Sequence, residues 1–297
     1  MRRFRIAHLS DIHLGPVPSP AIGALISKRV FGYVNWKRNR AGALGSRILD
    51  AAVADIAAQG ADHVCVSGDL TNISLDDEFE NARRWLARLG APDEVSVVPG
   101  NHDAYVPGAA RRALAAWAPY AAGDSGRAGF PYLRRRGEVA IIGISSAVAT
   151  PPFSARGRVG TEQLKRLAAM LDRADDAHKV VMVHHPPLYA AAPFRRRLAD
   201  ANHLCDVLAE GAADIVLHGH NHAPSLDFLE TVRGSAAIVG VPSASSDGTK
   251  HPAGGYALID IDAVAGTASM IRRVWDRLAG DFVPEPATPL SPLRSDN

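Results

Sequence analysis

The sequence predicts an α/β protein in which a sheet lies between layers of helices. Short apolar runs alternate with longer stretches whose apolar residues recur at helical spacing, which is typical of α/β layering. After residue 221 the apolar runs continue with few helical windows between them, and this favours a second sheet packed on the first over a separate domain. Hydrophobic residues make up 47% and charged residues 22% of the chain, a balance that excludes general disorder.

The individual elements follow from local patterns. We expect buried strands over 4–9, 63–66, 95–98, 139–145, 180–183 and 215–217, with helices between them over 47–59, 75–89, 106–118, 161–174 and 195–210. The helix at 161 has a clear start, because Gly160 or Thr161 can cap it and Glu162 lies in its first turn. Strands near 225–231, 235–241, 254–261 and 267–275 form the expected second sheet. We predict a single domain over 1–278 and a flexible tail over 279–297, which has four prolines and no periodicity.

Residues 12–49 form a basic insertion that contains no Asp or Glu. Its apolar residues from Ile22 to Trp36 have the spacing of an amphipathic helix. Two interpretations remain open: the segment packs over the core with its cations in solvent, or it contacts an anionic substrate or a membrane surface. Peripheral membrane contact is expected through residues 22–40 under the second interpretation. The cations concerned are Lys28, Arg29, Lys37, Arg38, Arg40 and Arg47.

Several features bear on the compartment. The longest apolar runs fall short of the roughly 18 to 20 residues that span a bilayer, and the basic N-terminus lacks the apolar stretch of a signal peptide. Cys65 and Cys205 are too few for a disulfide scaffold or a four-cysteine zinc site, and their apolar surroundings indicate buried thiols. We therefore expect a cytoplasmic protein, associated with a membrane surface if residues 22–40 make that contact. The net charge of +2 predicts no specific nucleic-acid recognition, and the sequence does not set the oligomeric state.

The ends of the expected strands carry the residues of greatest chemical interest. In α/β proteins the loops after the strands converge in a crevice, where sites are usually built. Each of five strands here runs into side chains that bind metals. Single motifs of this kind are weak evidence, but their joint occurrence at five strand ends is not expected by chance. The segments are Asp11-Ile-His13, Gly68-Asp69-Leu70-Thr71-Asn72, Gly100-Asn101-His102-Asp103, His184-His185 and His218-Gly219-His220-Asn221-His222.

These segments offer enough ligands for two metal ions. A catalytic zinc site takes three protein ligands, so seven fit two ions that share a carboxylate. The mixture of imidazole, carboxylate and amide groups fits two divalent transition-metal ions (Mn, Fe, Zn or Co) better than Mg or Ca. Glycines at 68, 100 and 219 would let the backbone turn sharply toward the site. The seven candidate ligands are Asp11, His13, Asp69, Asn101, His184, His220 and His222.

In their order along residues 6–222, these motifs resemble those of the calcineurin-like metallophosphoesterase superfamily. The resemblance implies a four-layer α/β/β/α sandwich with two packed mixed sheets and a dimetal site at the strand ends. It also implies that Asp69 bridges the two metals and that His102 faces the scissile phosphate, with Asp103 orienting it. Asn72 and His185 would lie beside the pocket, supporting the ligands or facing the substrate. The first metal would be held by Asp11, His13 and His222, and the second by Asn101, His184 and His220.

The implied function is hydrolysis of a small phosphomonoester or phosphodiester by in-line attack of a metal-bridging hydroxide, with His102 acting on the leaving group. The chain has His13 and Asn72 where the purple acid phosphatase branch has Gly and Tyr, so it is more similar to the bacterial branch of phosphodiesterases and phosphatases. Two narrower alternatives are a cyclic-nucleotide phosphodiesterase and a hydrolase of lipid phosphates or pyrophosphates at a membrane surface. A non-enzymatic scaffold is disfavoured, because such members lose ligands and this chain has the full set.

Overall fold

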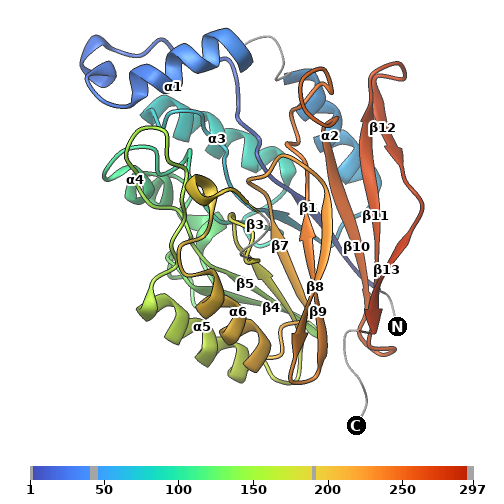
Figure 1. Cartoon of the computed structure of the whole chain (residues 1–297). Helices are drawn as coiled ribbons and strands as arrows, with labels where there is room; N and C mark the ends of the chain where they lie inside the picture. The colour runs from blue at the N-terminus through green and yellow to red at the C-terminus, as the bar shows by residue number, and fades with distance from the viewer. Residues whose placement is uncertain (1–2, 41–45, 189–191, 293–297) are drawn as a thin grey trace.

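The computed structural model describes residues 3–40, 46–188 and 192–292. Two mixed sheets pack face to face, and helices cover the outer face of each, so the expected four-layer α/β arrangement is present (Figure 1). Side chains along β6 show how the layers are formed. Val180 and Met182 belong to the core shared with the first sheet, whereas Val181 belongs to the core under the outer helices. This alternation follows from the two-residue period of a strand.

The first sheet has the order β12-β11-β10-β1-β2-β3, with β13 also paired to β11. Strands β1, β2 and β3 are parallel, and β10 to β13 add antiparallel partners. The parallel strands are mostly apolar and are buried at their C-terminal ends, as expected for strands covered on both faces. The strands are β1 (Phe4–Leu9), β2 (His63–Val66), β3 (Val95–Val97), β10 (Gly255–Asp262), β11 (Thr267–Asp276), β12 (Asp281–Pro284) and β13 (Thr288–Pro292).

The second sheet has the order β4-β5-β6-β7-β9-β8. Its central strands β5, β6, β7 and β9 are parallel, and the edge strands β4 and β8 pair antiparallel with them. The C-terminal ends of β6 and β7 therefore lie at one edge of this sheet, near the ends of β1 to β3 in the other. The strands are β4 (Tyr132–Arg136), β5 (Val139–Gly143), β6 (His178–Met182), β7 (Ile215–His218), β8 (Ser225–Thr231) and β9 (Gly234–Gly240).

The helices form the two outer layers. Apolar residues of α2 (Ser46–Ala58), α3 (Asp76–Leu89) and α4 (Ala109–Ala116) join the core of the first sheet. Those of α5 (Thr161–Arg173) and α6 (Ala201–Glu210) form the core on the outer face of the second sheet. Two helices are shorter than the patterns predict: α4 begins after Gly108, whose φ is +79°, and α6 begins after Asp200. No described helix is long and apolar enough to cross a membrane.

The C-terminal segment differs from the expected flexible tail. Residues of β12 and β13 pair with the two halves of β11, and Leu290 and Phe282 are buried in the core. Prolines are tolerated here because both strands lie beside β11 at the edge of the sheet, where a missing N–H costs little. Residues 293–297 of the expected tail lie outside the described residues.

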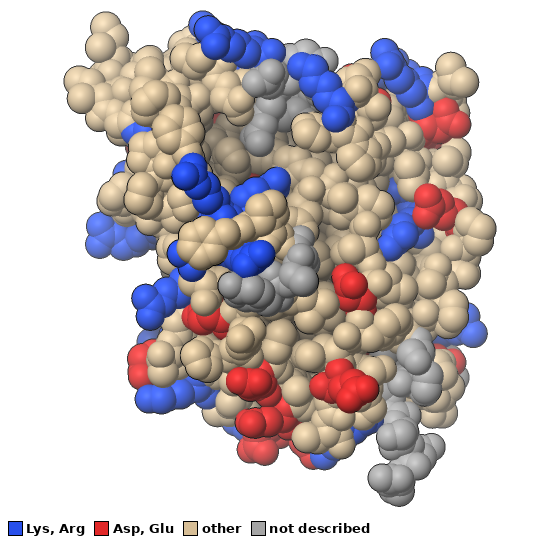
Figure 2. All heavy atoms as spheres, viewed as in Figure 1, with Lys and Arg blue, Asp and Glu red and all other residues tan. Residues whose placement is uncertain are grey.

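The basic insertion differs from the expected continuous helix over 22–36. A short 3-10 helix, Ile22–Leu25, is followed by α1 (Arg29–Asn35) and one wider helical turn, Trp36–Arg40. Ser27 separates the two helices, because its hydroxyl donates to the Ala24 carbonyl and accepts from the Arg29 N–H. The insertion projects beside a hollow, and its surface is largely tan with flanking blue cations (Figures 1 and 2). Residues 41–45 of the insertion lie outside the described residues.

Candidate metal centre

The predicted ligands converge where the parallel strands of both sheets end. Asp11 and His13 follow β1, Asp69 follows β2, Asn101 follows β3, and the remaining histidines follow β6 and β7. Main-chain bonds hold the loops together: the Asp11 N–H donates to Gly68 O, and the His13 N–H donates to Asp69 O. The convergence is thus a direct result of parallel strand order, with one loop contributed by each strand.

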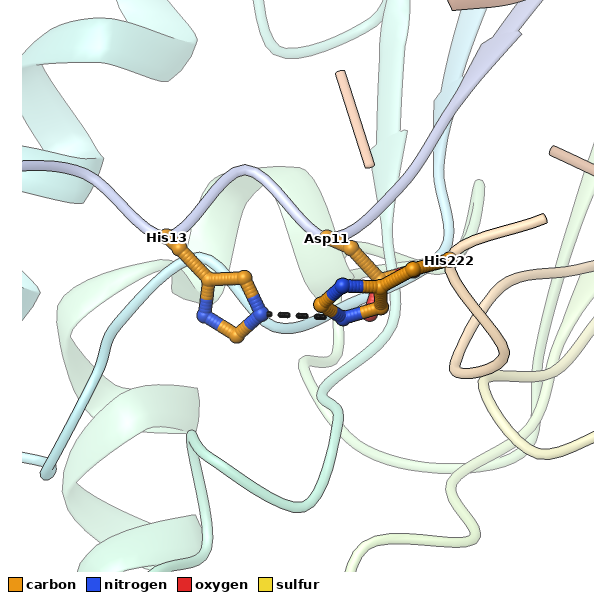
Figure 3. Close-up of side chains that lie close together, drawn as sticks. All are labelled: Asp11, His13 and His222. Atoms are coloured by element: carbon orange, nitrogen blue, oxygen red, sulfur yellow. Dashed lines mark hydrogen bonds and ion pairs between the residues drawn. The ribbon is translucent and has the colours of Figure 1, made fainter. Parts of the chain in front are cut away.

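One group of donor atoms contains Asp11, His13 and His222. His222 Nε2 lies 3.1 Å from Asp11 Oδ1 and 3.3 Å from His13 Nε2 (Figure 3). These three atoms lie within 4.8 Å of one another, so one ion can contact all three. Asp11 and His13 lie in the first motif along the chain and His222 lies in the last. They meet because the two sheets pack face to face.

A second group contains Asn101, His184 and His220. His184 Nε2 lies 3.2 Å from Asn101 Oδ1 and 3.2 Å from His220 Nδ1. Asp69 lies between the two groups, since its Oδ2 is 3.5 Å from His184 Nε2 and 3.8 Å from His13 Nε2. The contacts therefore place Asp69 between the two sets of side chains, and the division of the ligands between two ions stays a prediction.

Asp11 and Asp69 each accept a main-chain hydrogen bond through one carboxylate oxygen, and the other oxygen faces the imidazoles. Asp11 Oδ2 accepts the His220 N–H at 2.8 Å, and Asp69 Oδ1 accepts the His102 N–H at 2.7 Å. Asp11 Oδ1 is buried and accepts no hydrogen bond from the described residues. A buried carboxylate oxygen without a hydrogen-bond donor is costly unless a cation binds it. The donor set thus fits a metal centre.

The imidazoles are oriented by main-chain carbonyls. His13 Nδ1 lies 3.1 Å from Thr71 O, and His184 Nδ1 lies 2.8 Å from Ser67 O. His220 uses its other nitrogen in this way, with Nε2 2.9 Å from Arg196 O. In each ring the N–H donates to the carbonyl, so the opposite nitrogen can offer its lone pair to the group of ligands when the ring is neutral. Such outer contacts fix the tautomer and the ring plane of metal-binding histidines.

The backbone at the site is strained. Five of the seven predicted ligands have positive φ: Asp11 (53°), His13 (44°), Asp69 (54°), His220 (69°) and His222 (53°). Side chains other than glycine rarely adopt this conformation, and it clusters at functional sites. Of the three predicted glycines, Gly68 alone has a positive φ (103°), whereas Gly100 and Gly219 allow close approach. A Cβ at Gly100 would overlap the Asp69 carboxylate, and one at Gly219 would overlap Ser10 and Asp11.

Both carboxylates are held in the ionised form that metal binding requires. Burial acts to raise the pKa of Asp69, but the imidazoles of His184 and His102 outweigh it and hold the pKa well below its ordinary value. Burial likewise acts to raise the pKa of Asp11, and the nearby imidazoles of His222 and His184 reverse that effect. The neighbouring imidazoles therefore stabilise the negative charge of both carboxylates.

His102 and Asp103 lie in the loop after β3, and Asp103 was expected to orient the His102 ring. Each of the two side chains is instead held by other partners. His102 Nδ1 lies 2.6 Å from the main-chain oxygen of Asn72, so this carbonyl orients the ring. Asp103 is buried and accepts hydrogen bonds from Leu70 N, Thr71 N, Thr71 Oγ1 and Gly100 N. We therefore correct its role: Asp103 ties the loops after β2 and β3 together.

Comparison with known proteins identifies the family. A model of the calcineurin-like phosphoesterase family matches residues 4–224, well over half of the chain and all of the site described above. The chain belongs to the calcineurin-like phosphoesterase family. No curated protein matches the sequence.

Solved structures of two phosphatases share the fold. A dimetal phosphatase from Danio rerio has a TM-score of 0.58 and 15% identity, and the match covers 95% of this chain and 98% of that one. The purple acid phosphatase PPD1 from yellow lupin has the same TM-score and identity, and the match covers 95% of this chain and 53% of the plant chain. At such low identity the likeness shows the fold alone, so the metal-binding roles remain predictions from the residues.

His185 and Asn72 can now be placed in this phosphoesterase site. Both ring nitrogens of His185 have protein partners, Ser146 Oγ at 2.7 Å and Ala155 O at 3.1 Å, so the ring has no lone pair to offer a metal. Burial and the neighbouring His184 lower its pKa to about 3, which keeps it neutral. Asn72 donates from Nδ2 to Leu14 O, and its side chain also lines the cavity beside His102. His185 is thus held by protein groups beside His184, whereas Asn72 lines the cavity.

A cavity of about 380 Å³ adjoins the metal centre, and its walls combine the basic insertion with the loops after β2, β3 and β5. Lys28 of the insertion lies over the Tyr105 ring, with Nζ 4.3 Å from its centroid, and Nζ donates to Thr150 O at 2.8 Å. Burial lowers the pKa of Lys28 to about 8. Tyr105 in turn stacks on His102, with ring centroids 5.5 Å apart. The advance signal for these walls is their place in the chain, because they belong to the basic insertion and to loops that follow the expected strands, where α/β proteins form their crevice.

Proposed function

We propose that this protein is a dimetal-dependent phosphoesterase that hydrolyses phosphomonoesters or phosphodiesters. The observation that carries the proposal is the pair of donor groups joined by Asp69, beside a cavity lined by His102. Asp11, His13 and His222 would hold one ion, and Asn101, His184 and His220 the other. When bound, two such ions supply an activated water nucleophile at neutral pH and neutralise charge on the phosphate oxygens.

The chain's own residues would position the ester and handle its leaving group. Asn72 and Lys28 line the cavity and can bind phosphate oxygens through an amide N–H and an ammonium group. His102 uses Nδ1 toward Asn72 O, so we assign the contact with the leaving oxygen to its Nε2. In its protonated form His102 would transfer the Nε2 proton to that oxygen as the phosphorus–oxygen bond breaks. Stacking against Tyr105 keeps the ring in place.

Metal reconstitution tests the proposal directly. The purified protein would be stripped with a chelator, reloaded with Mn, Fe, Zn or Co ions, and assayed for bound metal by mass spectrometry. Hydrolysis would be measured on p-nitrophenyl phosphate, bis-p-nitrophenyl phosphate and the 2′,3′- and 3′,5′-cyclic nucleotides. We expect about two ions per chain and metal-dependent hydrolysis of at least one ester class. A protein that binds two ions and hydrolyses none of these esters would contradict the proposal.

A further inference from the structure

The insertion and the loop opposite it expose an unusual set of large apolar side chains, which we call the apolar rim. Ile22 is 85% exposed, Ile26 is 83% exposed, and Phe31 is 53% exposed. Phe153 reaches across from the loop after β5, with 75% exposure and its ring centroid 5.4 Å from that of Phe31. An exposed apolar patch of this kind usually marks a binding surface. The rim consists of Ile22, Ile26, Val30, Phe31, Val34 and Phe153.

The rim is exposed because α1 docks on the protein through its opposite side. Arg29 donates to the carbonyl oxygens of Ile73 and Ser74, at 2.9 and 2.6 Å. A Cβ on Gly32 would lie 2.6 Å from the Tyr105 hydroxyl, so this small residue marks the point of closest approach. An amphipathic helix usually packs its apolar side inward. Here polar bonds and a glycine fix the helix, and the apolar side faces solvent.

The loop opposite α1 also exposes a large apolar side chain, Phe153. Phe153 has φ of 64°, a conformation that bulky side chains rarely adopt, and its side chain is held out over the mouth of the cavity beside Phe31. The Thr150 carbonyl at the base of this loop accepts the Lys28 ammonium hydrogen bond at 2.8 Å. The two sides of the rim are therefore joined by the hydrogen bonds of Lys28 to Thr150 and by the contact between the Phe31 and Phe153 rings.

Charge identifies the partner that fits this rim. The whole of 12–49 lacks acidic residues, and the exposed cations Lys37 and Arg38 follow α1 directly. Tyr33 and Trp36 stack with ring centroids 6.1 Å apart, and the Lys37 ammonium lies over the Tyr33 ring. The projecting part of Figure 2 is accordingly tan with blue beside it. Apolar residues flanked by cations and by aromatic rings with a polar edge are typical of surfaces that enter the headgroup region of anionic membranes.

We propose that the apolar rim docks on an anionic lipid bilayer and that the substrates are phosphoesters carrying a hydrocarbon chain, presented at that bilayer. Phe31 and Phe153 belong both to the rim and to the cavity that holds His102 and Asn101. A phosphate bound at the metal centre would thus leave its hydrocarbon chain along the two rings. The substrate class rests on the proposed phosphoesterase function, whereas docking on the bilayer does not.

Vesicle binding tests the docking surface without using catalysis. Sedimentation with phosphatidylcholine vesicles, with or without phosphatidylglycerol, would be compared for the wild type and for Ile22→Ser/Ile26→Ser. Neither substituted side chain lines the cavity. The matched control is Val232→Ser/Val264→Ser, which changes two exposed valines on turns remote in sequence from the rim. We expect binding to the anionic vesicles alone, reduced at least about ten-fold in the rim variant and unchanged in the control. Lys37→Gln/Arg38→Gln should weaken the same binding, and about 1 M NaCl should too.

Hydrolysis tests the substrate class with matched esters. p-Nitrophenyl methyl phosphate and p-nitrophenyl dodecyl phosphate release the same leaving group, so their ratio of kcat/KM reports the hydrocarbon chain alone. We expect the dodecyl ester in anionic vesicles to be preferred by at least about ten-fold, and the preference to be lost in Ile22→Ser/Ile26→Ser while turnover of the methyl ester stays the same.

The outcomes separate the two proposals. Hydrolysis of soluble esters without vesicle binding would overturn the docking surface and leave the phosphoesterase function standing. Vesicle binding that Ile22→Ser/Ile26→Ser retains would overturn the assignment of the surface. A wild type that forms a dimer and binds no vesicles, together with loss of that dimer in the variant, would overturn it too, because the rim would then be a dimer interface. Rim-dependent vesicle binding by a metal-loaded protein that hydrolyses none of the esters would support docking and overturn the phosphoesterase function. Equal turnover of the two esters would overturn the substrate class.

Discussion

His102 Nδ1 lies 2.6 Å from the main-chain oxygen of Asn72. Three residues earlier in the same loop, Asp69 accepts the main-chain N–H of His102 at 2.7 Å. A main-chain acceptor cannot be removed by substitution of its own side chain, so the ring orientation is fixed by the fold of the loop after β2. The same loop packs against the loop after β3, which carries His102 itself. The position of this histidine thus depends on two strand ends at once.

Replacement of His102 should separate catalysis from metal binding. We expect His102→Ala to lower kcat by about 10²–10⁴-fold on an ester with a poor leaving group, because the proton donor is lost. The loss should be smaller for p-nitrophenyl esters, whose leaving group needs little protonation. Metal content should stay near that of the wild type and of His203→Ala, an exposed histidine of α6. Loss of metal together with activity would show that His102 is a ligand or a structural residue.

Asp69 should couple the two metal ions. Asp69→Asn removes the negative charge that both imidazole groups face at 3.5 and 3.8 Å, so both ions should bind more weakly. Metal content after gel filtration, measured by mass spectrometry, should fall below one ion per chain, and hydrolysis should fall with it. Asp172→Asn on the exposed side of α5 is the matched control. An Asp69→Asn protein with two ions and full activity would refute the shared role.

Neighbouring histidines should differ in their effect on metal binding. His184→Gln removes a ring whose Nε2 faces Asn101 and Asp69, so we expect loss of about one of the two ions. His185→Gln changes a ring whose nitrogens are engaged by Ser146 and Ala155, so both ions should remain. The measurement is metal stoichiometry at matched protein concentration. Equal loss in the two variants would show that His185 also serves the metals.

The sequence was sufficient to predict the parts of this molecule that depend on local pattern and parallel strand order. Apolar runs located β1, β2 and β6 closely, and the residues after them had to meet because parallel strands end at one edge. Main-chain partners were not predictable, because every residue offers a carbonyl and only the folded loops show which one meets His102. Pairing of β12 and β13 with β11 was missed for a similar reason, since it depends on contacts distant in sequence.

Two further features were not predictable from the sequence in detail: the buried arginine of β4 and the shape of the cavity. β4 contains three consecutive arginines and was not expected as a strand. Arg134 is nevertheless buried, and its guanidinium donates to the carbonyls of Pro92, Val95, Pro119 and Ala122, which satisfies the charge without a carboxylate. The cavity combines the insertion with residues 150–155, two segments that no motif connects. Strand ends therefore predicted which candidate ligands meet, whereas the shape of the cavity depends on tertiary packing.

Asp103 should act through stability. Asp103→Ala leaves the N–H groups of Leu70, Thr71 and Gly100 buried without their acceptor, which we expect to lower the free energy of unfolding by about 3 kcal/mol. Urea denaturation should show a lower midpoint with an unchanged slope, relative to Asp172→Ala. Asp103→Asn should fall between them, since one oxygen remains. Full stability with a loss of kcat like that of His102→Ala would instead support the orienting role first expected for Asp103.

Lys28 should give substrate binding a pH dependence of its own. Burial lowers the pKa of Lys28 from 10.5 to about 8, so its positive charge is present below pH 8 and lost as the pH rises through that value. For stability the sign is opposite: between about 8 and 10.5 the unfolded chain holds the proton that the folded chain has released, so stability rises with pH.

Kinetics on bis-p-nitrophenyl phosphate isolate this effect, because the charge of that diester is constant over the range. We expect KM to rise roughly ten-fold between pH 7 and pH 9.5 as the contact between the ammonium group and the phosphate is lost. Lys28→Met should have the high KM at every pH, while Lys37→Met, beyond the cavity on the same insertion, should follow the wild type. Changes in kcat with pH report the metal centre and should be shared by all three proteins. A pH-dependent KM that persists in Lys28→Met would show that another group binds the phosphate.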